Sequence, residues 1–497
     1  MNKIMRKLLL IIMLLSLIFS ACANNDAEPD NGKPYLAETD DAVIGETTTE
    51  ENRILPNLSA DTNFNGYTFN VLIRDTGDEW TPRDVFAEKE NGDLINDAVY
   101  RRNRVIEEKY NFKIEQKVVF EYIGNPITKA VASGDNEFDI AYPFLCDVPD
   151  LAQKGYFVDL LRVPNLDLTR LWWDAKATAA LSVGGKLYFT AGDLMLMNFD
   201  ACPGILFNKT LLDDNNLQNP YDLVDKNEWT INKLYEMSRA APKDLNGDGA
   251  MTYDADCFGF IGQRDALTSF LHGADEIICG KDADDYPVIK FGSERAYKAM
   301  EECFRLMYDQ NITHNAHHIE GKVPNIYTVS EDMFMDQRAL FMWVRLRIVE
   351  KLRGMETDFG ILPMPKLESS QTNWGHTVNK YVGAGLVVPM TADNLERTGF
   401  ILEAIAAESM YTTVKAYYDV ALKTKFARDN ESSEMLDIIF ASTVYDTGEI
   451  YNFGTFGRDL IWMSMTNDTN LASLFGKAEP KMEKEIDNVI KKYGDLD

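Results

Sequence analysis

The sequence is poor in cysteine and histidine, the side chains that most often build disulfide frameworks and zinc sites. Its 497 residues include six cysteines and five histidines. After Cys22 the cysteines are scattered and form no Cys-x-x-Cys pair: Cys146, Cys202, Cys257, Cys279 and Cys303. Residues 313–318 hold three histidines without the spacing of a zinc-binding helix. Neither a disulfide framework nor a zinc site is indicated, a single bridge is left open, and the histidine segment is predicted to be a solvated loop.

Basic residues are scarce relative to acids, and recognisable catalytic motifs are missing. Lys and Arg number 50 against 79 Asp and Glu, which gives a formal net charge of −29. Such a charge argues against nucleic acid as a partner and against a polyanionic ligand, although a local basic cleft is compatible with the total. Neutral or cationic ligands fit better. The sequence contains no Gly-x-Ser-x-Gly elbow, phosphate loop or Rossmann glycine run, so no enzyme class is indicated.

Long hydrophobic runs are confined to the N-terminus. Three basic residues precede the apolar run 8–19, which is too short for a permanent membrane span. Residues 1–21 are therefore predicted to be a signal peptide. The small residues before Cys22 resemble the bacterial lipobox, which predicts that Cys22 is lipidated and that residues 22–63, which are rich in acidic and polar side chains, form a flexible linker. Ordinary secretion with an incidental Cys22 is the alternative.

The remaining body is too long for one hydrophobic core and predicts two or more domains. Residues 67–74, 112–120 and 138–142 have the pattern of strands, with apolar residues at helical spacing over 94–110 between the first two. Further strands are predicted at 185–190, 204–208, 339–343, 359–362 and 385–389. This alternation predicts an α/β fold with mainly parallel sheets, whose ligand site lies beyond the carboxyl ends of the strands, in a cleft between two lobes.

Several short segments, taken in their order, resemble the extracellular solute-binding proteins of ABC transporters, in the carbohydrate-binding group that includes maltodextrin-binding proteins. They are residues 96–110, 138–141, 154–160, 172–174, 185–188, 207–209, 229–230, 359–366 and 416–418. The resemblance implies a two-lobed, periplasmic-binding-protein-like fold with the ligand cleft between the lobes. It assigns residues 64–188 and 382–430 to lobe 1, and residues 189–381 and 431–497 to lobe 2. It further implies a lipid-anchored, extracytoplasmic receptor that is not an enzyme and delivers a carbohydrate, expected to be an oligosaccharide, to ABC permease subunits on other chains.

A saccharide site needs aromatic platforms and planar or charged hydrogen-bonding groups. Trp80 follows the first predicted strand, Trp343 lies in a segment similar to the family stretch that carries a sugar-stacking tryptophan, and Trp374 precedes the expected return between lobes. The full set of predicted ligand-binding residues is Asp78, Trp80, Tyr142, Phe144, Trp343, Arg345, Asn373 and Trp374. Each aromatic residue could equally be a core residue, and more so the pair Trp172 and Trp173.

Residues 244–256 resemble an EF-hand calcium loop. Asp244, Asn246 and Asp248 occupy positions 1, 3 and 5, and a glycine follows at position 6. The Ala250 carbonyl, with Asp254 or Asp256, would complete a set of oxygen ligands for a structural Ca²⁺, although position 12 is Ala255 instead of an acid. An Asp- and Gly-rich surface turn without metal is the alternative.

Two other functions remain open at this level. A surface hydrolase or lyase would need two carboxyl groups held across one bound sugar, a spacing that the sequence does not reveal. A sensor or adhesin with the same fold would bind a solute without a permease.

Overall fold

The computed structural model describes residues 53–418 and 430–496. The predicted signal peptide, Cys22 and most of the predicted linker lie outside the described residues, as does the expected last exchange between lobes near residue 430. In the described part of the chain, no helix is both long and apolar enough to cross a membrane.

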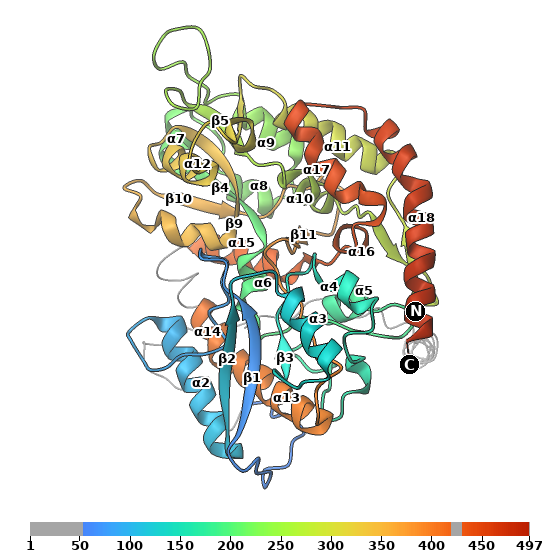
Figure 1. The fold of residues 1–497 in the computed structure, drawn as a ribbon. Helices are drawn as coiled ribbons and strands as arrows, with labels where there is room; N and C mark the ends of the chain where they lie inside the picture. The colour runs from blue at the N-terminus through green and yellow to red at the C-terminus, as the bar shows by residue number, and fades with distance from the viewer. Residues whose placement is uncertain (1–52, 419–429, 497) are drawn as a thin grey trace, which may run out of the picture. The chain divides into compact units, whose positions relative to one another are not determined.

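The first sheet is parallel and has the order β2-β1-β3 (blue and cyan in Figure 1). The first part of the chain contains β1 (Tyr67–Arg74), α2 (Leu94–Tyr110), β2 (Phe112–Val119), α3 (Gly124–Ser133), β3 (Ile140–Ala141), α4 (Val148–Ala152), η2 (Leu160–Arg162), α5 (Ala175–Leu181) and α6 (Leu196–Asp200). The Asp93 carboxylate caps α2 by accepting from the Ile95 and Asn96 amides, and Asn111 ends the helix in the left-handed region. These local signals explain why the strand–helix–strand unit agrees with its sequence prediction.

The second sheet is mixed, with the order β10-β4-β9-β5-β8. The middle part of the chain contains β4 (Pro203–Asn208), α7 (Lys209–Asp214), α8 (Pro220–Asp225), α9 (Ile231–Ser238), β5 (Phe258–Gly262), α10 (Ala266–Gly273), β6 (Cys279–Lys281), β7 (Pro287–Ile289), α11 (Glu294–Met307), β8 (Thr313–Asn315), η3 (Ala316–Ile319), α12 (Ile326–Met335), β9 (Ala339–Arg345), η4 (Leu346–Gly354), β10 (Phe359–Leu362) and β11 (His376–Thr377). The expectation of mainly parallel sheets is wrong here in one respect: β4 runs antiparallel to both of its neighbours, β9 and β10.

The chain then returns to the first sheet. Val387 bridges Ala141 and Leu386 bridges Thr190, both antiparallel. The predicted strands at 185–190 and 385–389 therefore exist only as isolated bridges, which also include Phe157 with Pro389 and Val183 with Lys186. Phe400 of α13 (Leu395–Tyr411) packs edge-on against Tyr110 of α2, which fixes α13 to the first sheet. We call the two sheets with their packed helices the first and second lobes.

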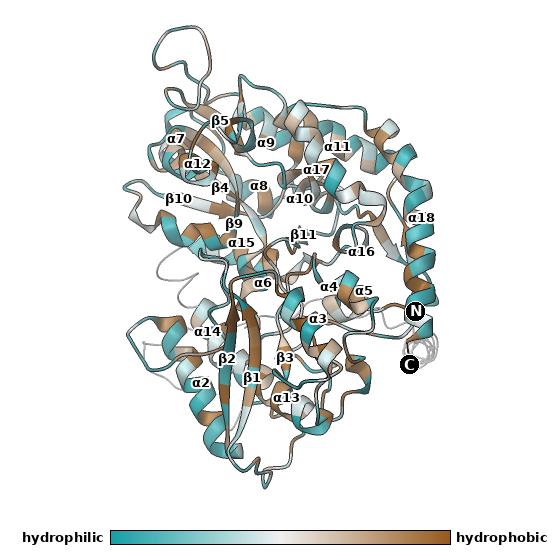
Figure 2. Ribbon diagram, viewed as in Figure 1, coloured by the Kyte–Doolittle hydropathy of each residue, from teal (hydrophilic) through white to brown (hydrophobic). Residues whose placement is uncertain are grey.

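Helix α14 (Thr413–Tyr417) still packs against α2 and α13 of the first lobe. The C-terminal part then returns to the second lobe and contains α15 (Asn430–Ala441), β12 (Thr443–Val444), α16 (Thr447–Ile450), η6 (Phe453–Thr455), α17 (Phe456–Thr466) and α18 (Leu471–Asp495). Strand β12 pairs in parallel with β11, and the Ser432 hydroxyl of α15 accepts from the Ile361 amide of β10. Helix α18 buries one apolar stripe, from Leu471 to Tyr493, and its visible surface is mostly hydrophilic in Figure 2.

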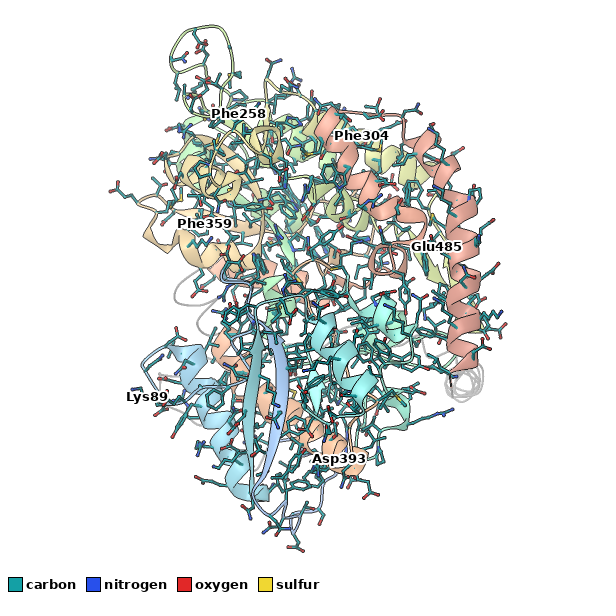
Figure 3. All side chains as sticks on the ribbon, viewed as in Figure 1. Lys89, Phe258, Phe304, Phe359, Asp393 and Glu485 are labelled. Atoms are coloured by element: carbon teal, nitrogen blue, oxygen red, sulfur yellow. The ribbon has the colours of Figure 1, made fainter. Side chains whose placement is uncertain are left out.

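A continuous hydrophobic core runs through both lobes. In Figure 3 the labelled Phe258, Phe304 and Phe359 are buried, whereas the labelled charged residues Lys89, Asp393 and Glu485 are exposed. The aromatic pair Trp172 and Trp173 is fully buried, and both indole N–H groups donate to the Glu403 carboxylate of α13, at 3.0 and 2.9 Å. This pair therefore packs the first lobe and does not face a ligand.

Candidate functional site

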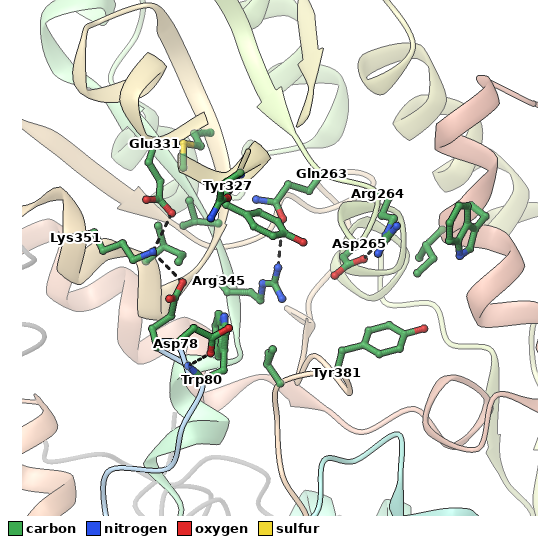
Figure 4. A pocket seen from close by; sticks show the side chains of 18 of the residues that line it. Asp78, Trp80, Gln263, Arg264, Asp265, Tyr327, Glu331, Arg345, Lys351 and Tyr381 are labelled. Atoms are coloured by element: carbon green, nitrogen blue, oxygen red, sulfur yellow. Dashed lines mark hydrogen bonds and ion pairs between the residues drawn. The ribbon is translucent and has the colours of Figure 1, made fainter. Parts of the chain in front are cut away.

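A pocket of about 640 Å³ lies between the loop after β1 and the carboxyl ends of β5 and β9 (Figure 4). The first lobe contributes Asp78, Glu79 and Trp80, and the returning segment contributes Tyr381 and Val382. The second lobe contributes the rest of the lining: Gln263, Arg264 and Asp265 after β5; Asn325, Tyr327 and Glu331 of the α12 region; Met342, Val344 and Arg345 of β9; Ile348 and Lys351 of η4; and Arg458, Ile461 and Trp462 of α17. Both the volume and the place beyond the strand ends are typical of small-molecule sites in α/β folds.

A tight turn after β1 positions Trp80. The Asp75 carboxylate accepts from the Gly77 amide at 2.7 Å and from the Thr81 hydroxyl at 2.8 Å, and these donors lower the pKa of Asp75. Asp78 accepts from the Trp80 amide at 2.9 Å. Gly77 has φ +73°, a conformation that side chains other than glycine rarely adopt. The turn thus presents a half-buried indole to the second lobe.

Arg345 ends β9 and points into the pocket. The residue is only 8% exposed, and its guanidinium carbon lies 5.1 Å from the ring centre of Trp80 and 5.9 Å from that of Tyr327. One guanidinium nitrogen contacts the Gln263 amide oxygen at a long 3.4 Å. The cation is therefore enclosed mainly by aromatic faces, which attract it electrostatically.

Lys351 joins two carboxylates at one side of the pocket. Its ammonium lies 2.9 Å from Glu79 of the first lobe and 3.5 Å from Glu331 of the second. Burial would raise the pKa of Glu79, but the hydrogen bond and positive charge of Lys351 outweigh it and lower that pKa. For Glu331 burial is the larger effect, and its pKa is raised. These contacts tie the two lobes together through one ammonium group that is shared by two carboxylates.

Arg264 and Asp265 form the opposite wall. Their side chains lie 3.7 Å apart, and the Arg264 guanidinium also lies 4.9 Å from the Trp462 ring centre. Asp265 accepts a hydrogen bond from the Asn379 amide at 3.2 Å. The charges on this wall are thus also matched within the protein.

A buried polar network supports the returning segment next to Tyr381. His272 of α10 lies 3.1 Å from Asp446 and 3.9 Å from Glu449. Burial alone would lower the pKa of His272, but the hydrogen bond with Asp446 and the nearby carboxylates raise it. Lys380 donates to the Glu449 carbonyl and lies 5.1 Å from the Tyr381 ring centre. The network anchors the segment that contributes Tyr381 and Val382 to the pocket.

Three of the predicted ligand-binding residues line this pocket: Asp78, Trp80 and Arg345. Trp343 does not line it: its side chain is fully buried in β9, although its ring centre lies 5.8 Å from the guanidinium carbon of Arg345.

The other four predicted residues also lie away from the pocket. Tyr142 and Phe144 follow β3 and are buried in the first lobe, 5% and 8% exposed. Asn373 is exposed and donates to Asp275, and the Trp374 ring centre lies 4.1 Å from the Lys366 ammonium. These residues were predicted from their positions near a strand end or near a crossing between lobes, and such positions do not determine the direction of a side chain.

The pocket also contains aromatic residues that the sequence analysis missed: Tyr327, Tyr381 and Trp462. They come from α12, the returning segment and α17, which are far apart in the sequence. Asn325, which caps α12 by accepting from the Tyr327 and Thr328 amides, gives a local signal for the helix start, but nothing in the sequence shows that this end faces the pocket.

In the loop over residues 244–256, the acidic side chains bind the loop's own backbone. Asp244 accepts from the Gly247 and Gly249 amides, and the Asp248 carboxylate accepts from Ala250. Asp256 accepts from Leu245 and Thr252 and so joins the two ends of the loop. Across residues 53–418 and 430–496, no three His, Cys, Asp or Glu side chains lie where they could hold a metal ion together.

The histidine segment is not the solvated loop that its sequence predicted. His314 belongs to β8, which pairs with the buried strand β5, and His317 lies in η3; both are buried. Burial is the main reason that the pKa of each falls to about 4, so both imidazoles are neutral at physiological pH.

No protein-family model and no curated protein matches the sequence. Solved structures do match the fold. A cyclo/maltodextrin-binding protein complexed with maltotetraose superposes with a TM-score of 0.55 at 13% identity, covering 84% of this chain and 97% of the other. A sugar transporter protein from Rhizobium etli gives 0.53 at 13% identity over 86% and 99%. An ABC substrate-binding protein from Listeria monocytogenes, in complex with cycloalternan, gives 0.51 at 12% identity over 86% and 99%.

At these identities the comparison establishes the fold, which is the two-lobed α/β fold of periplasmic-binding proteins. The fold class predicted from the sequence is therefore confirmed.

Proposed function

We propose that this protein, which has the fold of sugar-binding components of ABC transporters, is an extracytoplasmic receptor that captures a carbohydrate and delivers it to an ABC-type permease. The solved structures that share its fold support this proposal, because those described above are substrate-binding or sugar-transport proteins and two contain bound glycans. The permease subunits would be other chains.

The observation that carries the proposal is the composition of the pocket. Trp80 of the first lobe and Tyr327 of the second approach the pocket from different elements, and Tyr381 and Trp462 add two further rings. Saccharides present apolar C–H faces that stack on such rings and hydroxyl groups that bind charged and amide side chains. Because the lining comes from both lobes, a bound saccharide would contact both and stabilise their association.

The charges of the pocket favour binding over catalysis. Glu79 and Glu331 both contact Lys351, and Asp265 is held by Arg264 and Asn379. A glycosidase needs one carboxylic acid to give a proton and a second carboxylate across the scissile bond. Lys351 lowers the pKa of Glu79, which makes Glu79 a poor proton donor. Burial raises the pKa of Glu331, but Glu331 shares Lys351 with Glu79 at one side of the pocket and does not face it across a bound sugar, so we expect the glycan to leave the protein unchanged.

A thermal-unfolding screen tests the proposal. The purified protein is heated with a panel of mono- and oligosaccharides, neutral and acidic, and with di- and tripeptides as the comparison. A ligand present at one hundred times its Kd should stabilise the folded state by about 2.7 kcal/mol. We expect one glycan class to raise the melting temperature; stabilisation by peptides alone would overturn the proposal.

Lipid anchoring through Cys22 is part of this proposal. More than one acyl chain on the N-terminal cysteine would hold the receptor at the outer face of the membrane. In the producing cell, Cys22→Ala should move the protein from the membrane fraction to the soluble fraction. Cys146→Ala, which removes a thiol from the folded body, should leave it in the membrane fraction. Equal membrane association of wild type and Cys22→Ala would contradict anchoring.

Calcium binding by residues 244–256 is a further part of the proposal. Asp244, Asn246 and Asp248 would supply side-chain oxygens for a cation that braces the loop. We expect the melting temperature to be higher in Ca²⁺ than in a chelator. The Asp248→Asn variant should show a smaller difference between these two melting temperatures. Asp284→Asn, in another acidic turn, is the control and should respond as the wild type does. A melting temperature insensitive to Ca²⁺ and chelator would leave the loop as a metal-free turn.

A further inference from the structure

Arg345 is the one pocket cation of the described residues that has no carboxylate partner. Its side chain is buried, and its contacts are the faces of Trp80, Tyr327 and Trp343, together with one long hydrogen bond to Gln263. In Figure 4 the guanidinium group extends from β9 between Tyr327 and Trp80 into the pocket. A guanidinium has five N–H donors, and the contact with Gln263 is the one hydrogen bond to protein that the described residues give Arg345.

The other cations of the pocket each contact a carboxylate. Lys351 contacts Glu79 and Glu331, and Arg264 contacts Asp265. Arg458 contacts the adjacent Asp459 at 2.8 Å. Asp78 accepts hydrogen bonds within its own turn and lies in the exposed loop. Lys351 is shared by two carboxylates and Asp78 makes no ion pair within the described residues, so the pocket as a whole carries no excess of positive charge. Arg345 differs from its other cations because it lacks a carboxylate partner.

An unpaired cation that is largely removed from water is costly unless a ligand supplies an acceptor. A carboxylate suits a guanidinium best, because its two oxygens can accept two parallel N–H···O bonds from the planar fork. The aromatic rings around Arg345 provide stacking faces for a sugar ring that carries the carboxylate.

We propose that the bound solute is an acidic saccharide, a sugar bearing a uronate carboxylate, and that Arg345 binds this carboxylate while Trp80 and Tyr327 stack on the sugar. This inference rests on the proposed function and narrows its ligand class. It also revises the expectation from net charge, which favoured neutral or cationic ligands, because the local surroundings of Arg345 outweigh the total charge at the distance of a contact.

Isothermal titration with matched glycans tests this assignment. Oligogalacturonates are compared with their methyl esters, and uronate disaccharides with their carboxyl-reduced counterparts, so that each pair differs only at the acidic group. We expect at least one uronate to bind about tenfold or more tightly than its neutral counterpart. A difference of this size is typical of one charge-assisted hydrogen bond that the neutral glycan cannot make. Arg345→Gln should remove this preference, and Arg345→Lys, which keeps the charge but loses the fork, should retain part of it.

The control is Arg239→Gln, which removes an exposed arginine that also lies over an aromatic ring but is outside the pocket. It should keep the wild-type preference, and the melting temperature of each variant shows whether the fold is intact. Neutral glycans that bind as tightly as the acids, or sulfated sugars that bind in place of uronates, would overturn the inference and leave the proposed function standing. If neither acidic nor neutral saccharides bind, the acidic-saccharide inference and the proposed function both fail.

Discussion

Replacing Glu403 by alanine should destabilise the protein by about 3 kcal/mol or more. Glu403 is 2% exposed and accepts from the indole N–H groups of both Trp172 and Trp173. The alanine variant leaves these two buried donors without an acceptor and opens a cavity in the first lobe. Denaturant unfolding of the purified protein measures the loss.

The matched control is Glu396→Ala, an exposed acid in the first turn of the same helix, α13. The Glu396→Ala substitution should lower the free energy of unfolding by less than about 1 kcal/mol, because it removes only the interaction of this carboxylate with the helix N-terminus. Similar losses in the two variants would show that the paired tryptophans do not depend on Glu403.

Trp80→Ala should weaken saccharide binding about 10- to 100-fold while leaving the unfolding free energy nearly unchanged. The indole lies at the pocket wall, where it can stack on a sugar and where it covers one face of Arg345 at 5.1 Å. Losses of this size are typical of an aromatic residue at the centre of a binding site. Because Trp80 lies in a loop and is only half-buried, little packing is lost.

Trp374→Ala distinguishes this pocket from the site predicted by sequence alone. Both tryptophans were candidates for stacking, but Trp374 contacts Lys366 and does not line the pocket. Calorimetric titration of the two variants should show a loss of affinity for Trp80→Ala and none for Trp374→Ala. The reverse result would place the site outside the pocket described here.

The parts of the fold that the sequence predicted well are those with local signals. The strands Tyr67–Arg74 and Phe359–Leu362 were predicted with the same bounds, and the helix Leu94–Tyr110 has an aspartate cap and a regular apolar stripe. The segments around residues 187 and 387 were predicted as strands but form isolated bridges, because their pairing depends on partners far along the chain. The antiparallel direction of β4 also depends on where the chain enters the second sheet, which no local pattern records.

The difference between local and long-range signals also explains which pocket residues could be predicted from the sequence. Trp80 was predicted for the site because it lies just after the first strand, where a cleft-lining loop is expected, and it lines the pocket. Trp343 was predicted for the site because its segment is similar to a family stretch, but its side chain is fully buried and does not line the pocket. Tyr381 and Trp462 reach the pocket from the returning segment and α17, and only the folded chain brings these together.

The most direct test of the central claim is a titration of the protein with the glycan that stabilises it in the thermal screen, followed by recovery and mass analysis of that glycan. A receptor with one pocket between its lobes should bind one glycan per chain and release it chemically unchanged, however long the incubation. Recovery of shortened or unsaturated glycan would instead identify a hydrolase or a lyase and contradict the account.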